Sequence, residues 1–174
     1  MIDPLIALLG GLGFLLILAV VFWPQRGMMW RLQERRQLTE KVLVEDTLKY
    51  IFNCERNQRV VSLESLAGML STNPGHVSEI LALMQERGLV EFTENNFHLT
   101  DTGRKTATQI VRAHRLWERY LADATGYQES DWHQQAERRE HVLTVEELDR
   151  LSASLGHPTF DPHGDPIPTA RGDL

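Results

Sequence analysis

The chain has 174 residues, which allows one modest domain with appendages or two small domains. Its formal net charge of -6 argues against nonspecific nucleic-acid binding, which usually leaves a basic surface. The single cysteine, Cys54, excludes an internal disulfide and suits a reducing compartment. A buried small apolar residue is its ordinary interpretation.

Residues 5–23 form an uninterrupted run of apolar and glycine residues, closed by Pro24. A run of this length can cross the hydrocarbon core of a bilayer as a helix. A cleaved signal peptide is the alternative. It is disfavoured because no basic residue precedes the run, and because bulky Phe22 and Trp23 stand where small residues would precede a cleavage site. We therefore expect residues 1–27 to be a transmembrane anchor.

Basic residues follow this run closely. They are Arg26, Arg31, Arg35 and Arg36. The positive-inside rule then places the C-terminal side in the cytoplasm, which predicts a single-pass protein of the inner or plasma membrane. Residues 28–42 form a basic connector, which is either a solvated helix or a segment that meets anionic headgroups.

Residues 43–107 have the pattern of a winged helix-turn-helix domain. Apolar spacing predicts a helix over 43–54, and Ser62 can cap a helix that runs to Leu70. A second helix is expected over 75–87, ended by Gly88. Short strands over 89–92 and 97–100 flank a tight turn, and another helix begins at Asp101 or Thr102. Helix, turn, helix and hairpin in this order are typical of that domain.

Such a domain presents its second helix to the major groove of double-stranded DNA. The residues expected at the DNA are His76, Ser78, Glu79, Asn95, Arg104 and Lys105. Basic residues are few here, and the wing tip at 94–96 carries none, although a DNA reader gains most of its affinity from Lys and Arg at phosphates. A winged helix used for packing or protein binding therefore stays open as an alternative.

Histidines and carboxylates recur at helical spacing after residue 113. They are His114, Glu118, His133, Glu137, Glu140 and His141. Two helices broken near Gly126 would carry them, and side chains three or four residues apart share a helix face. A single pair of this kind is usually a weak surface ion pair. The whole set on two adjacent helices favours a site for a divalent cation of intermediate hardness.

The remaining chain begins with a capping box of Thr144 and Glu147, which opens a helix that ends near residue 155. The tail over 161–168 is proline-rich and expected to be extended. His157 and His163 are expected to be ordinary loop residues. The sequence has no glycine-rich phosphate loop and no nucleophile elbow, so we do not expect an enzyme.

Several linked motifs point to a known family. They are ERGLV and LTDTGRKTA of the winged helix, HRLWERYL at 114–121, H-x3-E-x2-EH at 133–141, LT-x-E at 143–146 and PHGDPIP at 162–168. In this order and spacing, residues 44–168 resemble the diphtheria toxin repressor family of metal-dependent regulators, including its manganese-sensing branch. The resemblance implies a mainly α fold: a winged helix domain with a small β-hairpin, then an all-helical metal-binding and dimerisation domain over 108–174. It also implies a cytoplasmic homodimer.

The resemblance implies two metal sites. An ancillary site would use His114, Glu118 and His133, and a regulatory site would use Asp46, Glu137, Glu140 and His141. Asp46 belongs to the winged helix domain, so a cation there would fix the angle between the two domains and hence the spacing of the recognition helices.

The ligand set bears on which metal is bound. Glu137 stands where the iron-sensing branch has a cysteine, and oxygen ligands favour Mn(II) or Fe(II), although Zn(II) would bind the same side chains. Lys49 stands where manganese sensors carry a carboxylate ligand, which disfavours a binuclear site.

The functional expectation is a membrane-anchored, metal-dependent repressor of metal-transport genes. The anchor and the acidic winged helix depart from the family pattern. The alternative is therefore a membrane metal sensor that regulates a metal transporter by protein contact, without binding DNA.

Overall fold

The computed structural model describes the backbone of residues 28–173 and the side chains of residues 39–173. The chain divides into two compact units, residues 1–41 and residues 42–174. The membrane anchor predicted at residues 5–23 lies outside the described residues. Within the described part, no helix combines the length and the apolar character needed to span a bilayer.

Helix α2 (Met28–Arg56) is the first described element. The sequence pattern predicts a separate helix over 43–54 behind a connector, whereas the structure has one continuous helix. The physical reason is local, since no glycine or proline interrupts the sequence between Met28 and Arg56.

The helix-turn-helix pair consists of α3 (Leu63–Met69) and α4 (Pro74–Glu86). Ser62 caps α3 in a reciprocal capping box with Ser65. Asn73 caps α4 by accepting a hydrogen bond from the backbone N–H of His76. The predicted pair of helices is confirmed, with bounds within a residue or two of those expected.

The wing is the antiparallel hairpin of β1 (Val90–Thr93) and β2 (Asn96–Leu99), in which Val90 lies opposite Leu99. Its two-residue turn places Glu94 and Asn95 at φ angles of 52° and 60°. Positive φ at both positions is the geometry that matches the twist of a hairpin. The predicted wing is therefore confirmed.

A hydrophobic core holds α2, α3, α4 and the wing together. Its fully or almost fully buried side chains include Leu48, Ile51, Leu66, Val77, Met84, Val90 and Leu99. Cys54 belongs to this core with 1% of its surface exposed, as its ordinary interpretation predicted.

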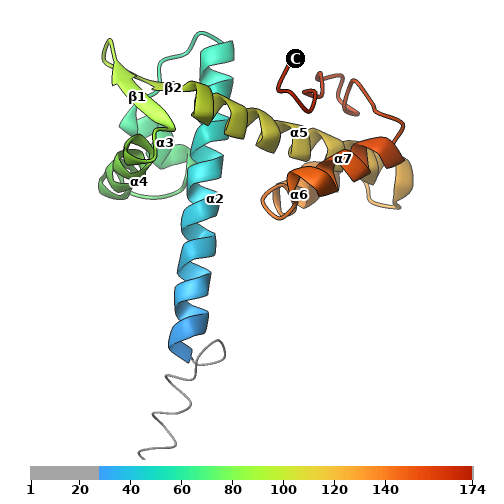
Figure 1. Cartoon of the computed structure of the whole chain (residues 1–174), viewed down its shortest axis with the longest axis horizontal. Helices are drawn as coiled ribbons and strands as arrows, with labels where there is room; N and C mark the ends of the chain where they lie inside the picture. Colours follow the sequence, from blue (N-terminus) through green and yellow to red (C-terminus); the bar gives the residue numbers. More distant parts are fainter. Residues whose placement is uncertain (1–27, 174) are drawn as a thin grey trace, which may run out of the picture. The chain divides into compact units, whose positions relative to one another are not determined.

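Helix α5 (Asp101–Ala124) leads from the wing to α6 (Glu129–Glu137) and α7 (Val145–Ser154) (Figure 1). Thr100 caps it by accepting from the N–H of Gly103. A second, smaller core joins Ala113 and Leu116 of α5 to Leu148 of α7 and to Ile167 of the tail. The region that follows the wing is thus mainly helical, as predicted.

The second helix of the metal-binding region is shorter than predicted. Helix α6 ends at Glu137, with Arg138 as its C-cap, and residues 138–142 form turns before α7. The expected single helix over 133–141 is therefore wrong in its C-terminal part. Because the helix ends at Glu137, the side chains of Glu137 and Glu140 do not share one helix face.

Candidate metal centre

One group of three ligand side chains joins α5 to α6. The ligand atoms of His114, Glu118 and His133 all lie within 4.8 Å of one another. Oε1 of Glu118 lies 3.1 Å from Nε2 of His114 and 3.1 Å from Nδ1 of His133. Two imidazole nitrogens and a carboxylate oxygen form a donor set that suits Zn(II), Mn(II) or Fe(II).

A second group joins α2 to the turn that follows α6. The ligand atoms of Asp46, Glu140 and His141 also lie within 4.8 Å of one another. Nε2 of His141 lies 3.4 Å from Oδ1 of Asp46 and 3.5 Å from Oε1 of Glu140. One nitrogen and two carboxylate oxygens again fit a divalent cation of intermediate hardness.

Glu140 links the two groups. Its side chain is fully buried, and its Oε2 lies 2.5 Å from Nδ1 of His114. The other nitrogen of His114 faces Glu118, so one imidazole contacts both groups. A buried carboxylate requires such partners, because an unpaired buried charge is costly.

Two partly buried histidines, His114 and His141, have raised pKa values that favour the protonated form. Burial lowers the pKa of His114, but hydrogen bonds to Glu118 and Glu140 outweigh it and raise the pKa to about 9. Burial likewise lowers the pKa of His141, and hydrogen bonds to Asp46 and Glu45 raise it to about 9. For Glu118, burial is the largest single influence and raises the pKa, but the hydrogen bonds and charges of His114 and His133 together lower it below its ordinary value. The protons on these rings supply the positive charge that a bound cation would otherwise supply to the neighbouring carboxylates.

Glu137 does not join the Asp46 group in this structure. Its Oε1 lies 3.3 Å from Nε2 of His133, on the side of the ring away from Glu118. The structure thus places the other residues expected at the regulatory site together and sets Glu137 beside the ancillary group. The end of α6 at Glu137 explains the separation, because residues beyond it leave the helix face.

Lys49 occupies a position next to Glu140. Its Nζ lies 2.5 Å from Oε1 of Glu140, the carboxylate oxygen that also faces His141. Glu45 was not anticipated from the sequence: its Oε2 lies 2.7 Å from Nδ1 of His141. No helical spacing relates Glu45 to His141, so only the packing of α2 against the turn after α6 could show this contact.

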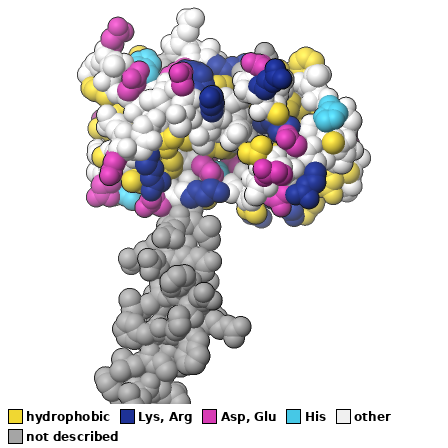
Figure 2. Space-filling view, in the orientation of Figure 1, with side chains coloured by type: hydrophobic (Ala, Val, Ile, Leu, Met, Phe, Trp, Pro, Cys, Tyr) yellow, Lys and Arg dark blue, Asp and Glu magenta, His cyan; other side chains and the backbone are white. Residues whose placement is uncertain are grey.

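The residues expected at DNA are exposed except His76, which is partly buried, and several are engaged locally. Nδ1 of His76 lies 3.0 Å from Oε2 of Glu79, and the hydroxyl of Ser78 donates to the carbonyl of Pro74. Asn95 and Lys105 are exposed, at the wing tip and on α5. On the face shown in Figure 2, acidic and basic side chains of the described residues are interspersed.

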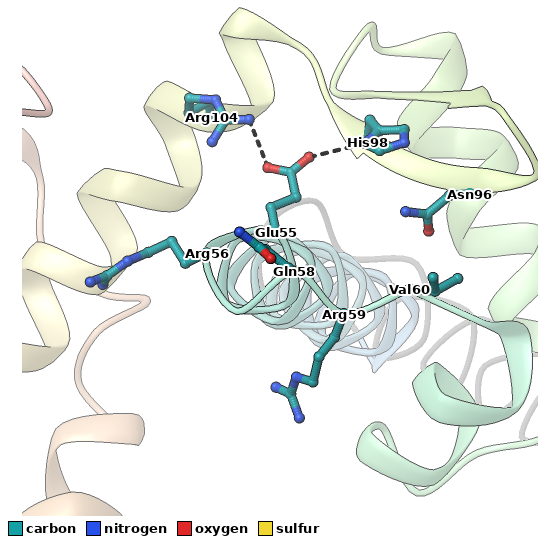
Figure 3. A pocket seen from close by; sticks show the side chains of 8 residues that line it. All are labelled: Glu55, Arg56, Gln58, Arg59, Val60, Asn96, His98 and Arg104. Carbon is teal, nitrogen blue, oxygen red and sulfur yellow. Dashed lines mark hydrogen bonds and ion pairs between the residues drawn. The ribbon is translucent and has the colours of Figure 1, made fainter.

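Arg104 is bound to a carboxylate. Its guanidinium lies 2.7 Å from Oε2 of Glu55, whose other oxygen faces His98 at 3.5 Å (Figure 3). These side chains line a cavity of about 570 Å³ between the end of α2, the wing and the start of α5. Arg56 and Arg59 also line it, and in Figure 3 their side chains point away from Glu55.

Comparison with known proteins finds a family match in the region that follows the wing. Residues 100–169 match the family described as iron dependent repressor, metal binding and dimerisation domain. The diphtheria toxin repressor of Corynebacterium diphtheriae is 35% identical over 132 residues, which are 74% of this chain and 58% of that protein. A solved manganese-dependent transcriptional repressor in complex with manganese has a TM-score of 0.68 and 38% identity, over 73% of this chain and 59% of the other.

Two chlamydial proteins, each named as a probable metal transport system membrane protein, are also similar. That of Chlamydia trachomatis is 44% identical over 86 residues, covering 49% of this chain and 19% of the relative. That of Chlamydia pneumoniae is 31% identical over 182 residues, covering 99% of this chain and 39% of the relative. The chain therefore spans less than two thirds of each of these relatives. Residues 100–169 thus match the metal-binding and dimerisation domain of the iron-dependent repressors, and the chain is homologous to iron- and manganese-dependent repressors.

Proposed function

We propose that the chain is a metal-dependent, DNA-binding transcriptional repressor that acts as a homodimer and responds to Mn(II) or Fe(II). The observation that carries this proposal is the convergence of Asp46, from α2 of the winged helix domain, with Glu140 and His141, from the turn after α6. These residues come from the two functional halves, so a ligand shared by them can set how the halves are held together.

The residues themselves suggest how the switch works. Without metal, the proton on His141 and the ammonium of Lys49 neutralise the buried carboxylate of Glu140. A bound divalent cation supplies more positive charge than a ring proton. Asp46, Glu140 and His141 would then hold α2 and the turn after α6 in one arrangement. The arrangement that binds the cation more tightly gains population, in proportion to the difference in affinity.

The donor atoms limit which metals can bind. Both groups offer only nitrogen and oxygen, which Mn(II) and Fe(II) accept, and Zn(II) would bind them as well. The regulated genes are proposed to be metal-transport genes.

We further propose that residues 5–23 anchor the protein in the inner or plasma membrane and leave residues 28–174 in the cytoplasm. The length of the apolar run and the arginines that follow it support this placement. The similar C. pneumoniae protein is named as a probable membrane protein, which supports this placement.

The test is a DNA titration. The full chain is added to DNA from upstream of its own gene at one fixed salt concentration, with and without Mn(II), Fe(II) or Zn(II). Fixed salt is needed because phosphate contacts make affinity steeply salt-dependent. DNA binding that requires metal supports a repressor. The order in which Mn(II), Fe(II) and Zn(II) promote DNA binding shows which metal the repressor responds to.

Calorimetry with a matched pair of variants tests the site. The double substitution Glu140→Ala with His141→Ala should abolish metal binding at the Asp46 group. The control changes another histidine–carboxylate pair, His76→Ala with Glu79→Ala, which is exposed on α4 and should leave metal affinity unchanged. Unchanged metal affinity in the first variant would show the site assignment to be wrong.

The second candidate function is a membrane metal sensor that regulates a metal transporter by protein contact. The similarity to two proteins named as parts of metal transport systems favours it, as does the ion pair that Arg104 makes with Glu55. Tight metal binding with no DNA binding above the nonspecific level would select this function.

A further inference from the structure

We propose that the cavity between the end of α2, the wing and the start of α5 is a binding site for a phosphomonoester, a small molecule that carries one terminal phosphate. Arg56, Arg59 and Arg104 would hold the phosphate group. The residues that line this cavity belong to neither group of metal-ligand side chains. The proposal therefore does not depend on metal binding.

Positive charge is in excess around the cavity. Three guanidinium groups and the imidazole of His98 line it, together with a single carboxylate, that of Glu55. Three guanidinium groups less one carboxylate leave an excess of two positive charges. The whole chain has a formal net charge of -6, so this local excess is opposite to the overall composition.

Glu55 uses only part of this positive charge. Its Oε2 lies 2.7 Å from the guanidinium of Arg104, and its Oε1 accepts a hydrogen bond of 3.0 Å from the backbone N–H of Leu99. Within the side chains described, those of residues 39–173, Arg56 and Arg59 form no ion pair, and both are exposed. These two guanidinium groups are therefore available to an anionic ligand.

The backbone around the cavity is held in place by hydrogen bonds. Gln58 has a φ of 54°, and the N–H of Arg59 donates to the carbonyl of Cys54 at 2.8 Å, as in a Schellman motif at a helix C-terminus. The N–H of Val61 donates to Oδ1 of Asn96, in the wing, at 2.9 Å. The segment that carries Arg59 is thus joined both to α2 and to the wing.

The two available arginines can turn toward a shared ligand. Figure 3 shows the side chains of Arg56 and Arg59 leaving the end of α2 in different directions, both away from Glu55. The Cζ of Arg56 lies 6.0 Å from the centre of the Phe52 ring, at the outer limit of a cation–π contact, so little opposes its movement. Guanidinium groups bind phosphate oxygens through paired hydrogen bonds, which would draw both side chains over the cavity beside Arg104.

Size and charge favour a phosphomonoester over a carboxylate. The cavity of about 570 Å³ lies within the range of about 300–1,000 Å³ for small-molecule sites, so it has room for an organic group beside the phosphate. A phosphomonoester carries about -1.5 to -2 charges at pH 7, which matches the excess of two positive charges. Val60, which is 70% exposed and also lines the cavity, offers an apolar surface to the organic group.

The experiment measures binding to the full chain by calorimetry, in a metal-free buffer with about 0.15 M sodium chloride to screen weak attraction between exposed charges. The probes are inorganic phosphate, AMP, adenosine and succinate. AMP should bind at least as tightly as inorganic phosphate, and adenosine, which lacks the phosphate, should not bind. Succinate is also a dianion but lacks the phosphate geometry, and it should bind about tenfold more weakly than phosphate or worse.

A matched pair of double variants locates the site. Arg56→Gln with Arg59→Gln should weaken AMP binding by about tenfold or more, the loss expected when hydrogen bonds to a charged group are removed. Lys105→Gln with Arg171→Gln removes the same charge at exposed positions outside the cavity and should bind AMP normally.

Amide hydrogen exchange shows where the ligand binds. AMP should slow exchange in residues 57–61 and 96–99 of the unsubstituted chain and leave it unchanged in the variant that lacks Arg56 and Arg59. Equal AMP affinity in the two double variants would overturn the site, as would succinate binding as tightly as phosphate. Binding of inorganic phosphate without binding of AMP would overturn the phosphomonoester as the ligand, and no binding of either would overturn the whole proposal.

Discussion

Lys49 places a positive charge beside the carboxylate of Glu140, one of the candidate metal ligands. Its Nζ is 2.5 Å from Glu140, and only 20% of its side chain is exposed. We predict that Lys49→Glu raises by one the number of Mn(II) ions bound per chain, because it removes an ammonium and adds an oxygen ligand near Asp46 and Glu140. Calorimetric or equilibrium-dialysis stoichiometry measures this.

The control for that prediction is Lys105→Glu, which makes the same charge change at an exposed position on α5. It should leave the stoichiometry unchanged. An unchanged stoichiometry in Lys49→Glu would mean that the ammonium does not block a second ion.

The two buried histidines should make the metal-free protein sensitive to alkaline pH. The pKa values of His114 and His141 are raised from 6.5 to about 9, so folding favours their protonated forms. This stabilisation is complete below about pH 6.5 and is lost as pH rises through about 9. We expect the unfolding temperature in the presence of a chelator to fall between pH 7 and pH 9.

The variant His141→Ala isolates the contribution of His141. Its unfolding temperature should fall less between pH 7 and pH 9 than that of the unsubstituted chain. His157→Asn should preserve it. An unfolding temperature that stays constant from pH 7 to pH 9 in the unsubstituted chain would contradict the protonated pairs.

At the scale of elements, the wing and α5 meet at a contact that only glycine allows. A Cβ built on Gly103 would lie 1.9 Å from the carbonyl oxygen of Leu89. The same carbonyl accepts the backbone N–H of Thr100, which caps α5, so the strand cannot move away without breaking the cap.

We therefore predict that Gly103→Ala destabilises the fold by about 1–3 kcal/mol, the usual cost of overpacking, as measured by urea unfolding. Gly68→Ala in α3 is the matched control, since no atom lies within 4 Å of its added Cβ. It should be neutral or slightly stabilising, because Ala is the better helix former. Equal effects of the two substitutions would rule out the proposed close contact.

The elements themselves were largely predictable from local sequence. Ser62 caps a helix and Thr144 opens a capping box with Glu147, both as expected, because a cap depends on residues within one turn. The hairpin was predictable for the same reason. The end of α6 at Glu137 was not, since residues 138–141 are all compatible with a helix and no local signal marks its end.

At the scale of the whole molecule, the proposed anchor predicts a topology. A reporter that is active only in the cytoplasm, fused after Leu174, should give signal, and a reporter active only outside the cytoplasm should not. The arginines that follow residues 5–23 are the physical reason.

A deletion of residues 5–23 serves as the control for that experiment. The cytoplasmic signal should persist, while the protein should move from the membrane fraction to the supernatant. Signal from the external reporter alone would show that the orientation is opposite to the proposed one. Full-length protein in the supernatant would show that residues 5–23 do not anchor the chain.

The sequence by itself determined the order of helices, the wing, the types of metal-binding side chain and the likeness to metal-dependent repressors. These depend on residues a few positions apart, where helix and strand periodicity fix which side chains share a face.

Only the tertiary structure decided which side chains from distant segments meet. It set Glu137 beside His133, Lys49 and Glu45 beside the Glu140–His141 turn, and His163 beside Glu118. Distances between segments up to about a hundred residues apart depend on how buried surfaces pack together, and no local periodicity encodes that packing.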